Sequence, residues 1–134
     1  MPVRDAATVM VIADQPDLQV LMVQRNSRVA FGPSAWVFPG GRVDIDDAAD
    51  HDHVTVGLSD EAASAFIEVE SGGRAWWVAA LRETLEEAGL LLGVDVATGD
   101  TIDRIRSAVH DDPTVFIERL AGSALTVDLS GIHE

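Results

Sequence analysis

The sequence predicts a single α/β domain, and three observations support this prediction. Its 134 residues suit one domain rather than two. Hydrophobic residues make up 47% and charged residues 24%, which is the balance of an ordinary globular protein rather than of a disordered chain. Short β-branched and apolar runs fill the first part of the sequence, and longer helical patterns follow them.

The amino-terminal part predicts three strands. Residues 8–13 and 18–24 are mostly β-branched or apolar, and the polar residues 14–17 between them form a tight turn. A third short strand is expected at residues 35–38, and the Pro-Gly-Gly sequence at 39–41 ends it abruptly. We therefore expect a hairpin followed by a strand that stops at a glycine turn.

The stretch from residue 44 to 70 holds nine acidic residues and no arginine. We interpret residues from about 45 to 73 as an acidic, solvated insertion within the single domain. One short helix capped by Ser59 is expected inside it. His51 and His53 lie among these acids, and they are more typical of a solvated loop than of a metal site.

The strongest helical pattern runs from residue 74 to 90, with Gly89 and Gly93 as its stop signals. Downstream we expect, in order, a brief strand at residues 94–96, a helix at 101–109, a short helix at 112–120 and a strand-like segment at 123–129. The cap of the first downstream helix is Asp100 or Thr101.

The charge balance excludes several classes of function. There are 23 acidic and 9 basic residues, every basic residue is arginine, and the formal net charge is −14. Such a chain repels polyanions, so nucleic-acid binding is not expected. The absence of lysine and cysteine excludes a lysine Schiff base, a phosphate-loop lysine, disulfides and thiolate metal sites. A small anionic substrate then requires a cation or local arginines at its site.

Nothing in the sequence predicts a targeting segment or a membrane span. The apolar runs are far shorter than a transmembrane helix needs. The amino terminus has no basic region followed by an apolar core, so no signal peptide is expected. We therefore expect a cytoplasmic protein that does not bind membranes.

The helix expected at residues 74–90 carries carboxylates on one face. At about 100° per residue, Glu83, Glu86 and Glu87 fall within an arc of roughly 100°. The opposite side carries apolar residues: Leu81, Leu85 and Ala88. Like charges at these spacings destabilise an isolated helix by roughly a few tenths of a kcal/mol per pair. A hard divalent cation such as Mg²⁺ would offset that cost, and the alternative is a solvated acidic face.

A glycine turn follows the third expected strand. Gly40 and Gly41 have no side chains, so their carbonyl and amide groups can approach a metal or a phosphate closely. Arg42 supplies a cation beside them. The alternative interpretation is an ordinary turn that binds no ligand.

Together, the glycine turn and the carboxylate helix resemble the signature of the Nudix hydrolase family. That signature is a glycine, five residues, a glutamate, seven residues, and then Arg-Glu-apolar-x-Glu-Glu-x-Gly-apolar. Its first half is resembled by Phe38-Pro39-Gly40-Gly41, and its second half by Arg82-Glu83, Glu86-Glu87, Gly89 and Leu90. Thr84 stands where an aliphatic residue is usual. The resemblance covers residues from about 8 to 120.

The middle of the signature departs from the family pattern. Asp47 stands where the family has glutamate, and 34 residues separate it from Arg82 in place of seven. A similar insertion, here of about 27 residues, interrupts the signature of one Nudix subgroup, whose better-known members are acyl-coenzyme A diphosphatases. In the family this glutamate pairs with the helix arginine. Here the partner of Arg82 is expected to be either Asp44 or Asp47.

The resemblance implies a fold and an activity. Nudix proteins are α/β/α sandwiches around a mixed sheet. They hydrolyse a nucleoside diphosphate linked to another moiety, which would be coenzyme A-like or nucleotide-sugar-like here. Mg²⁺ or Mn²⁺ is the implied cofactor, and its implied ligands are Glu83, Glu86, Glu87 and the carbonyl group of Gly40. Glu83 and Glu87 are the implied catalytic residues, and Glu83 would orient or deprotonate the attacking water.

Further roles are implied for other residues of the motif and its neighbours. The implied substrate-binding residues are Arg25, Arg28, Gly41 and Arg42. The implied structural residues are Arg82, Asp44, Asp47 and Gly89. The three tryptophans are expected mainly in the core, and base stacking by the first of them is the alternative: Trp36, Trp76 and Trp77.

The carboxyl-terminal part is shorter than the resemblance implies. Only 41 residues follow Gly93, and two expected helices use much of them. The strands that complete a Nudix sheet have no obvious counterpart, so the sandwich is expected to be incomplete in this chain. A homodimer or a complementing chain would complete it, since an unpaired sheet edge favours such pairing. The alternative function is a non-catalytic Nudix fragment or subunit that needs a partner chain to complete its site.

Overall fold

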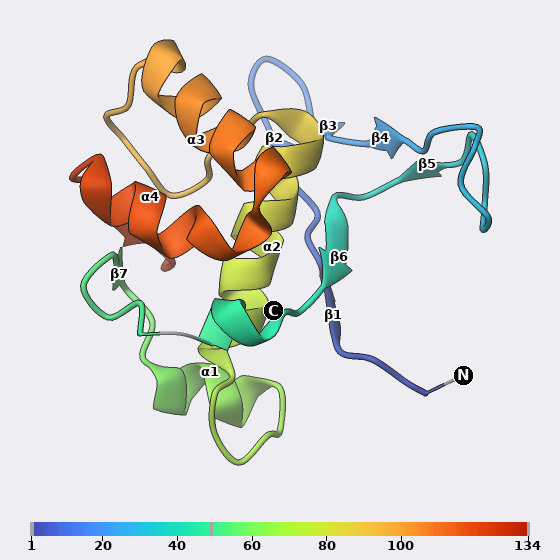
Figure 1. The fold of residues 1–134 in the computed structure, drawn as a ribbon. Helices are drawn as coiled ribbons and strands as arrows, with labels where there is room; N and C mark the ends of the chain where they lie inside the picture. Colours follow the sequence, from blue (N-terminus) through green and yellow to red (C-terminus); the bar gives the residue numbers. More distant parts are fainter. Residues whose placement is uncertain (1, 49, 134) are drawn as a thin grey trace.

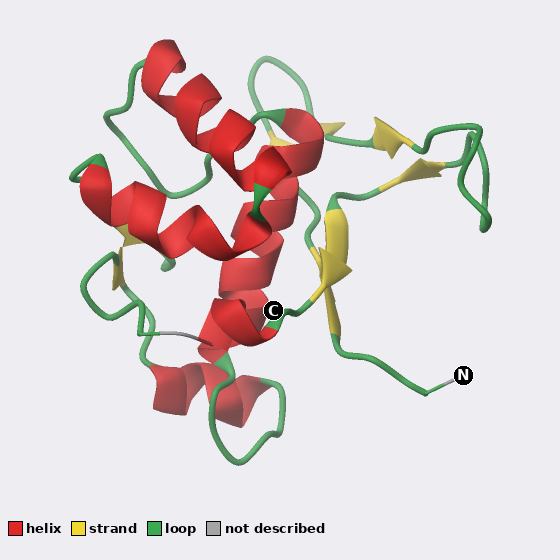
Figure 2. Ribbon diagram, in the orientation of Figure 1, coloured by secondary structure: helices red, strands yellow, loops and turns green. Residues whose placement is uncertain are grey.

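The computed structural model describes residues 2–48 and 50–133. Within them, the helices gather on one side and most of the short strands lie on the other (Figures 1 and 2). The helices are α1 (Asp60–Phe66), α2 (Arg74–Ala88), α3 (Gly99–Asp111) and α4 (Phe116–Gly122), with the short 3-10 helices η1 (Ile45–Ala48) and η2 (Pro113–Val115). The strands are β1 (Ala6–Thr8), β2 (Ile12–Ala13), β3 (Gln19–Val20), β4 (Val23–Gln24), β5 (Trp36–Val37), β6 (Gly40–Arg42), β7 (Thr55–Val56) and β8 (Val127–Asp128).

The strands form two-stranded pairs. β1 pairs with β6, β2 with β3 and β4 with β5, all antiparallel, whereas β7 and β8 are parallel. The expected hairpin is confirmed, since Ile12 lies opposite Val20. The extent of its strands, expected at residues 8–13 and 18–24, is wrong. Each is divided, because β1 pairs with β6 and β4 pairs with β5 beyond the short β2–β3 ladder.

The third strand, β5, ends at Val37, just before Pro39, as predicted, but Gly40 and Gly41 are not a terminating turn, because they begin β6. The N–H of Val9 donates to the carbonyl of Pro39 at 2.9 Å, so the contact with the amino-terminal segment starts before the glycines. A Cβ atom at Gly40 would lie 2.5 Å from the carbonyl oxygen of Ala7. A glycine is therefore required for the two strands to approach this closely.

Helix α2 lies at the centre of the fold and agrees closely with the helix expected at residues 74–90. It ends at Gly89, which adopts a left-handed φ of 70° and donates its N–H to the carbonyl of Leu85. One face of α2 packs into an apolar core shared with α3, α4 and β8. The largest buried side chains of this core include Leu81, Leu85, Ile105, Phe116, Leu120 and Leu129. Full burial of each such side chain contributes about 1.5–3 kcal/mol.

The other face of α2 packs on the β1–β6 pair through small residues. Ala79 and Ala80 are buried against Ala7 of β1. Because these side chains are short, the helix and the strand pair lie close together. Helix α2 therefore stands between the helical core and the strand pair, with its carboxylates near the glycines of β6.

The acidic insertion is not a solvated loop throughout, which corrects the prediction. Asp47, His51 and Val54 are buried, and β7 pairs with β8 from the end of the described chain. Its helix α1 is confirmed, with the Oγ atom of Ser59 accepting from the N–H of Ala62 at 3.1 Å. The insertion contributes Val54 and Ala63 to the apolar core.

The segment after α2 differs from the prediction at three points. The cap of α3 is Thr98 rather than Asp100 or Thr101, since its side chain accepts from the N–H of Thr101 at 3.3 Å. Within the described chain, residues 94–96 form no strand, and the strand expected within 123–129 is limited to β8. The short helix expected next is present as η2 and α4.

The three tryptophans do not share one environment. Trp77 is buried and its Nε1 atom donates to the carbonyl of Ile132 at 3.1 Å, whereas Trp76 is half-buried. The expectation that Trp36 lies in the core is wrong, because it is 63% exposed. It belongs to β5, which extends with β4 away from the helices (Figure 1). We call residues 23–37, from β4 through the loop to β5, the arm.

No helix among the described residues is both long enough and apolar enough to cross a membrane.

His51 is a buried titratable group of the insertion. Its Nδ1 atom has no hydrogen-bond partner within the described residues. Its imidazole is influenced by Arg74 from α2, by Asp60 from α1, and by Asp50 and Asp52 from its own segment. Burial, followed by the charge of Arg74, lowers the pKa of His51 below its ordinary value.

We expect His51 to make the protein less stable in acid. Because its pKa is lower in the folded state, the unfolded chain takes up the proton more readily as the pH falls. The stability that neutral His51 contributes is complete above its unfolded pKa of 6.5 and is lost below it. Urea midpoints at about pH 7.5 and about pH 5.5 should therefore differ less in His51→Gln than in the wild type. The exposed His53→Gln is the control, and an equal fall in wild type and His51→Gln would contradict the prediction.

Candidate active site

The carboxylate face of α2 lies directly against the glycines of β6. A Cβ atom at Gly41 would overlap the carboxyl group of Glu83. The backbone N–H of Gly40 is close enough to the carboxylate of Glu87 to lower its pKa. Glu83 and Glu86 are half-buried on the same helix, and Glu87 is the most exposed of the three glutamates. The structure thus brings together both halves of the motif that the sequence separates by the insertion.

Arg82 organises these carboxylates from below the surface. Its side chain is only 3% exposed, and it forms a bidentate ion pair with Asp47 at 2.9 and 3.0 Å. Its Nη1 atom donates to Glu83 and to Glu86, each at 2.9 Å. Asp44 lies farther away, with a closest approach of 3.7 Å. Of the two aspartates that the sequence left open, Asp47 is therefore the direct partner of Arg82.

The electrostatics of the site favour protons or cations. Burial raises the pKa of Glu83, and the charge of Glu86 adds to this effect, while Arg82 opposes it. Partial burial and the charge of Glu83 likewise raise the pKa of Glu87, although the backbone N–H of Gly40 acts to lower it. Burial acts to lower the pKa of Arg82. Its hydrogen bonds to Asp47 and Glu86 outweigh the effect of burial, so the pKa of Arg82 is raised. The glutamates therefore carry more negative charge than Arg82 neutralises.

The donor set suits a hard divalent cation. Carboxylate and carbonyl oxygens are the ligands that Mg²⁺ prefers, and Glu83, Glu86, Glu87 and Gly40 supply them on adjoining elements. No three of the described acidic or histidine side chains are gathered tightly enough to hold a metal as they stand. The reason is visible in the contacts, since Glu83 and Glu86 both direct an oxygen to Arg82. Only one oxygen of each of these two carboxylates contacts Arg82, so their second oxygens would be the ones that bind a cation.

The three arginines expected at the substrate have different surroundings. Arg25 lies close enough to Glu87 for its charge to lower the pKa of that carboxylate, although the net shift of Glu87 is upward. Arg42 is exposed and pairs with Asp44 at 3.1 Å. Arg28 is exposed in the loop of the arm. Of the three, Arg42 is joined to the network of Arg82 through Asp44.

Two residues that fix the end of α2 were not predicted. The Nε and Nη2 atoms of Arg106 in α3 lie 3.2 and 3.0 Å from the backbone carbonyl of Glu86. The Nε2 atom of His110 lies 3.1 Å from the same carbonyl. These contacts satisfy a carbonyl at the carboxyl-terminal end of the helix. Because they involve backbone rather than a side chain, no sequence pattern could have paired them with Glu86.

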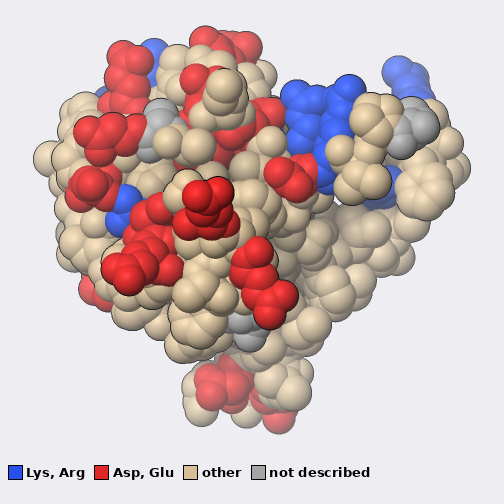
Figure 3. All heavy atoms as spheres, turned by 90° about the horizontal axis from the view of Figure 1, so that it is seen from below, with Lys and Arg blue, Asp and Glu red and all other residues tan. Residues whose placement is uncertain are grey.

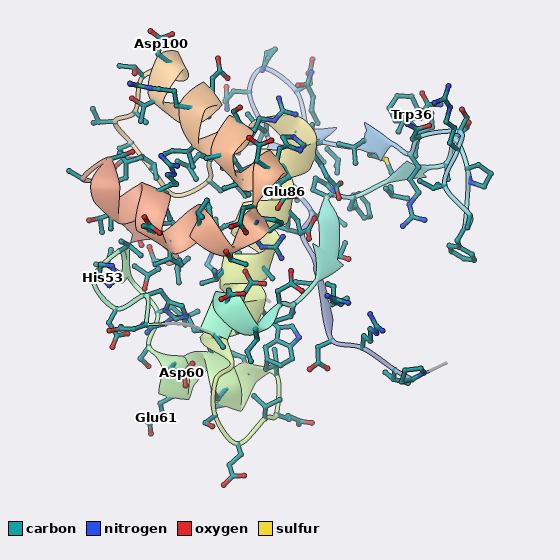
Figure 4. All side chains as sticks on the ribbon, in the orientation of Figure 1. Trp36, His53, Asp60, Glu61, Glu86 and Asp100 are labelled. Atoms are coloured by element: carbon teal, nitrogen blue, oxygen red, sulfur yellow. The ribbon has the colours of Figure 1, made fainter. Side chains whose placement is uncertain are left out.

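Apart from Asp47, labelled acidic residues of the insertion lie away from the site. In Figure 4, Asp60 and Glu61 lie in the lower part of the molecule and His53 at its left edge, away from Glu86. Figure 3 shows acidic atoms spread over the body of one face, while most of the arginine atoms in that view gather toward the side of the strands and the arm. The arginines thus lie on the side from which an anionic ligand would be least repelled.

A large groove lies apart from the carboxylates. It has a volume of about 790 Å³ and runs between the amino-terminal segment 6–12 and one side of α2. Trp76, Trp77 and Ala80 form its helical wall, and Ile132 and His133 contribute from the end of the described chain. None of the three site glutamates lines it. The groove is therefore not the candidate active site.

Comparison with known proteins points to one family. A scan against protein-family models found no match. Among solved structures, the chain is similar to the crystal structure of a NUDIX hydrolase from Alicyclobacillus acidocaldarius, with a TM-score of 0.69 and 28% sequence identity. The similarity covers 96% of this chain and 58% of that one, so the chain spans a little more than half of that protein's length. The helices and strands of this chain therefore form a Nudix-type α/β fold, and the likeness supports its placement with the Nudix hydrolases.

Proposed function

We propose that this chain is a divalent-metal-dependent hydrolase of diphosphate bonds. Its substrate would be a nucleoside diphosphate linked to another moiety. The observation that carries the proposal is the convergence of Gly40 and Gly41 on Glu83 and Glu87, organised by buried Arg82. Two sequence segments that resemble one signature, although separated by an insertion, lie side by side in the fold.

Glu83, Glu86, Glu87 and the carbonyl of Gly40 would hold Mg²⁺ or Mn²⁺. When bound, such a cation neutralises the charge of a diphosphate and makes a water more acidic. Glu83 is the residue that would orient or deprotonate the attacking water. It suits this role because its partly buried carboxylate has a raised pKa and therefore a higher proton affinity than an ordinary glutamate.

The protein's cations would act at the edge of the site. Arg25, Arg28 and Arg42 would bind the anionic substrate. Gly41 would let the substrate approach the backbone closely. Arg82 has a different role, since its buried pair with Asp47 makes it a positioning residue for the glutamates. Gly89 ends the helix that carries them.

The finer substrate assignment is a coenzyme A-like or nucleotide-sugar-like molecule. Its support is the interrupted signature, which resembles the acyl-coenzyme A diphosphatase subgroup. The insertion that interrupts the signature is folded into the core and supplies Asp47 to Arg82. An insertion of this kind can therefore preserve the geometry of the site.

A second candidate function is a subunit that acts only with a partner. The chain spans 58% of the Nudix hydrolase that it resembles, and an apolar groove of about 790 Å³ borders α2. A second copy or a complementing chain that fills this groove would then complete the protein. Sedimentation of the active species distinguishes the two candidates, because activity in a monomer of 14.3 kDa excludes the second.

The test is hydrolysis of a panel containing coenzyme A, ADP-ribose, NADH and a nucleoside triphosphate, with and without Mg²⁺ or Mn²⁺. We expect metal-dependent release of a phosphate-containing product from at least one of the diphosphate-linked compounds. Glu87→Gln should lose most of this turnover, because it removes a charged ligand. Activity that is independent of metal, or unchanged in Glu87→Gln, would contradict the proposal.

A further inference from the structure

The backbone carbonyl of Glu86 is held from outside its own helix. The Nε and Nη2 atoms of Arg106 donate to it at 3.2 and 3.0 Å, and the Nε2 atom of His110 lies 3.1 Å from it. Arg106 and His110 are four positions apart in α3, so they share one face of that helix. A Cβ atom at Gly89 would lie 3.0 Å from the Nη1 atom of Arg106, so this guanidinium also covers the end of α2. The carboxyl-terminal end of the carboxylate helix is therefore fastened to a second helix.

Helix α3 is itself anchored in the core. Ile105 and Val109 directly precede Arg106 and His110 in the chain, and both are buried. They belong to the apolar core that also includes Leu85 of α2. Arg106 therefore reaches the end of α2 from a fixed position rather than from a mobile surface segment.

The carbonyl that Arg106 holds belongs to the peptide group that joins Glu86 to Glu87. Because a peptide group is planar and rigid, fixing its oxygen restrains the backbone from which both carboxylates extend. Both residues lie in the last turn of α2, just before Gly89. Carbonyl groups lack helical partners at this end of a helix, and the last turn frays most readily. The contacts from α3 thus act at the point where two of the proposed metal ligands are least restrained by their own helix.

Arg106 and Arg82 act on the glutamates in different ways. Arg82 contacts one carboxylate oxygen of Glu83 and one of Glu86. The two hydrogen bonds from Arg106 go to backbone, so they occupy no carboxylate oxygen. Arg106 therefore restrains the ligands without competing for the atoms that would bind a cation.

We propose that Arg106 is a positioning residue that holds Glu86 and Glu87 in the arrangement that binds the divalent cation. The inference rests on the proposed function and adds to its metal site a residue from outside the motif. Arg106 supplies no ligand atom itself, so its effect is on the affinity for the metal. Loss of a residue that orients metal ligands typically lowers metal affinity or activity by about 10–100-fold.

The test compares Mn²⁺ binding by the wild type and by variants of two arginines of α3. Binding is measured without nucleotide, as the loss of the electron paramagnetic resonance signal of free Mn²⁺, at about 0.15 M ionic strength. Arg106→Met should weaken Mn²⁺ binding about tenfold. Arg106→Lys can donate to the carbonyl but has no planar fork of donors, so its Mn²⁺ affinity should lie between those of Arg106→Met and the wild type.

The matched control is Arg104→Met, which removes an exposed arginine two residues earlier in the same helix. It makes the same change in net charge as Arg106→Met and should bind Mn²⁺ as the wild type does. Removal of a positive charge near carboxylates would by itself strengthen cation binding. Weaker binding in Arg106→Met therefore reports the position of the ligands rather than the charge.

Two further measurements separate positioning from simple stabilisation. With an active substrate, Arg106→Met should raise the Mn²⁺ concentration at half-maximal rate about tenfold and leave kcat at saturating Mn²⁺ within about twofold. In the metal-free protein, backbone amides in the last turn of α2 should lose protection from hydrogen exchange, while those at the centre of α2 keep theirs. A lower urea midpoint with unchanged Mn²⁺ affinity would show a purely structural contact and overturn the inference. An equal loss of affinity in Arg104→Met, or no recovery in Arg106→Lys, would overturn it as well.

The two proposals fail in different ways. Specific Mn²⁺ binding and metal-dependent hydrolysis that are both unaffected by Arg106→Met overturn this inference alone. Mn²⁺ binding that depends on Arg106, in a protein that hydrolyses no diphosphate, overturns the proposed hydrolase activity and supports the positioning role. A wild-type protein without specific Mn²⁺ binding overturns both.

Discussion

Glu83→Gln is expected to lower kcat for metal-dependent diphosphate hydrolysis by about 10²–10⁴-fold, the range for loss of a general base. The carboxylate lies against Gly41 and has a raised pKa because it is partly buried near Glu86. Glutamine has nearly the same shape, but it can neither accept a proton nor supply charge. Steady-state kinetics on the active substrate of the panel measure the effect.

The same substitution should not weaken the fold. A raised carboxylate pKa means that folding disfavours the charged form, so a neutral isostere removes repulsion with Glu86 and desolvation cost. The urea midpoint of Glu83→Gln should therefore be close to that of the wild type or above it. Glu118→Gln, an exposed glutamate of α4, is the matched control and should change neither quantity. A Glu83→Gln enzyme within about threefold of wild-type kcat would exclude a base role for Glu83.

Arg82→Met is expected to destabilise the protein by about 3–5 kcal/mol, the usual cost of removing one partner from a buried ion pair. Both Arg82 and Asp47 have side chains that are only 3% exposed. Without the guanidinium, Asp47 would keep a buried charge, and Glu83 and Glu86 would lose their shared donor. Urea unfolding at neutral pH measures the loss.

A second substitution separates the ion pair from simple packing. Adding Asp47→Asn to Arg82→Met should recover part of the lost stability, because the uncompensated charge is then removed. Arg104→Met, an exposed arginine of α3, should change stability by less than about 0.5 kcal/mol. Arg82→Met with wild-type stability, or additive effects of the two substitutions, would contradict the account of Arg82 as the organiser of the site.

Much of the helical part of the fold could be predicted from the sequence. Helix α2 has apolar residues on one face and a glycine stop, and its extent was expected to within two residues. Helix α1 was expected from its serine cap. These elements depend on local signals, namely periodicity and capping, which a single sequence carries.

The strands and the insertion could be predicted less well, because they depend on distant partners. In the sequence, the glycines of β6 suggest the end of a strand. In the structure, Gly40 is required because β1 packs too closely beside it for a side chain. The pairing of β7 with β8 joins residues near 55 to residues near 127. Acidic composition predicted a solvated insertion, yet Val54 and His51 are buried. Composition does not report which residues of a segment face inward.

The candidate site divides in the same way. The two halves of the motif could be recognised in sequence, but the choice of Asp47 over Asp44 needed the bidentate geometry at Arg82. The support of Glu86 by Arg106 and His110 involves a backbone carbonyl and has no sequence signal. The segments that come together could thus be predicted from their side chains, whereas the individual contacts between them could not.

The central claim is that the glutamates of α2 form a metal site, and its most direct test is Mn²⁺ binding in the absence of nucleotide. Binding is measured as the loss of the electron paramagnetic resonance signal of free Mn²⁺. Wild type, Glu87→Gln and the control Glu118→Gln would be titrated at about 0.15 M ionic strength, so that weak binding to the acidic surface is screened. We expect a specific Mn²⁺ site in wild type and Glu118→Gln. In Glu87→Gln the Mn²⁺ affinity should be lower than in wild type by about tenfold or more. Equal binding by all three proteins, or no specific binding by the wild type, would contradict the claim that the glutamates of α2 form a metal site.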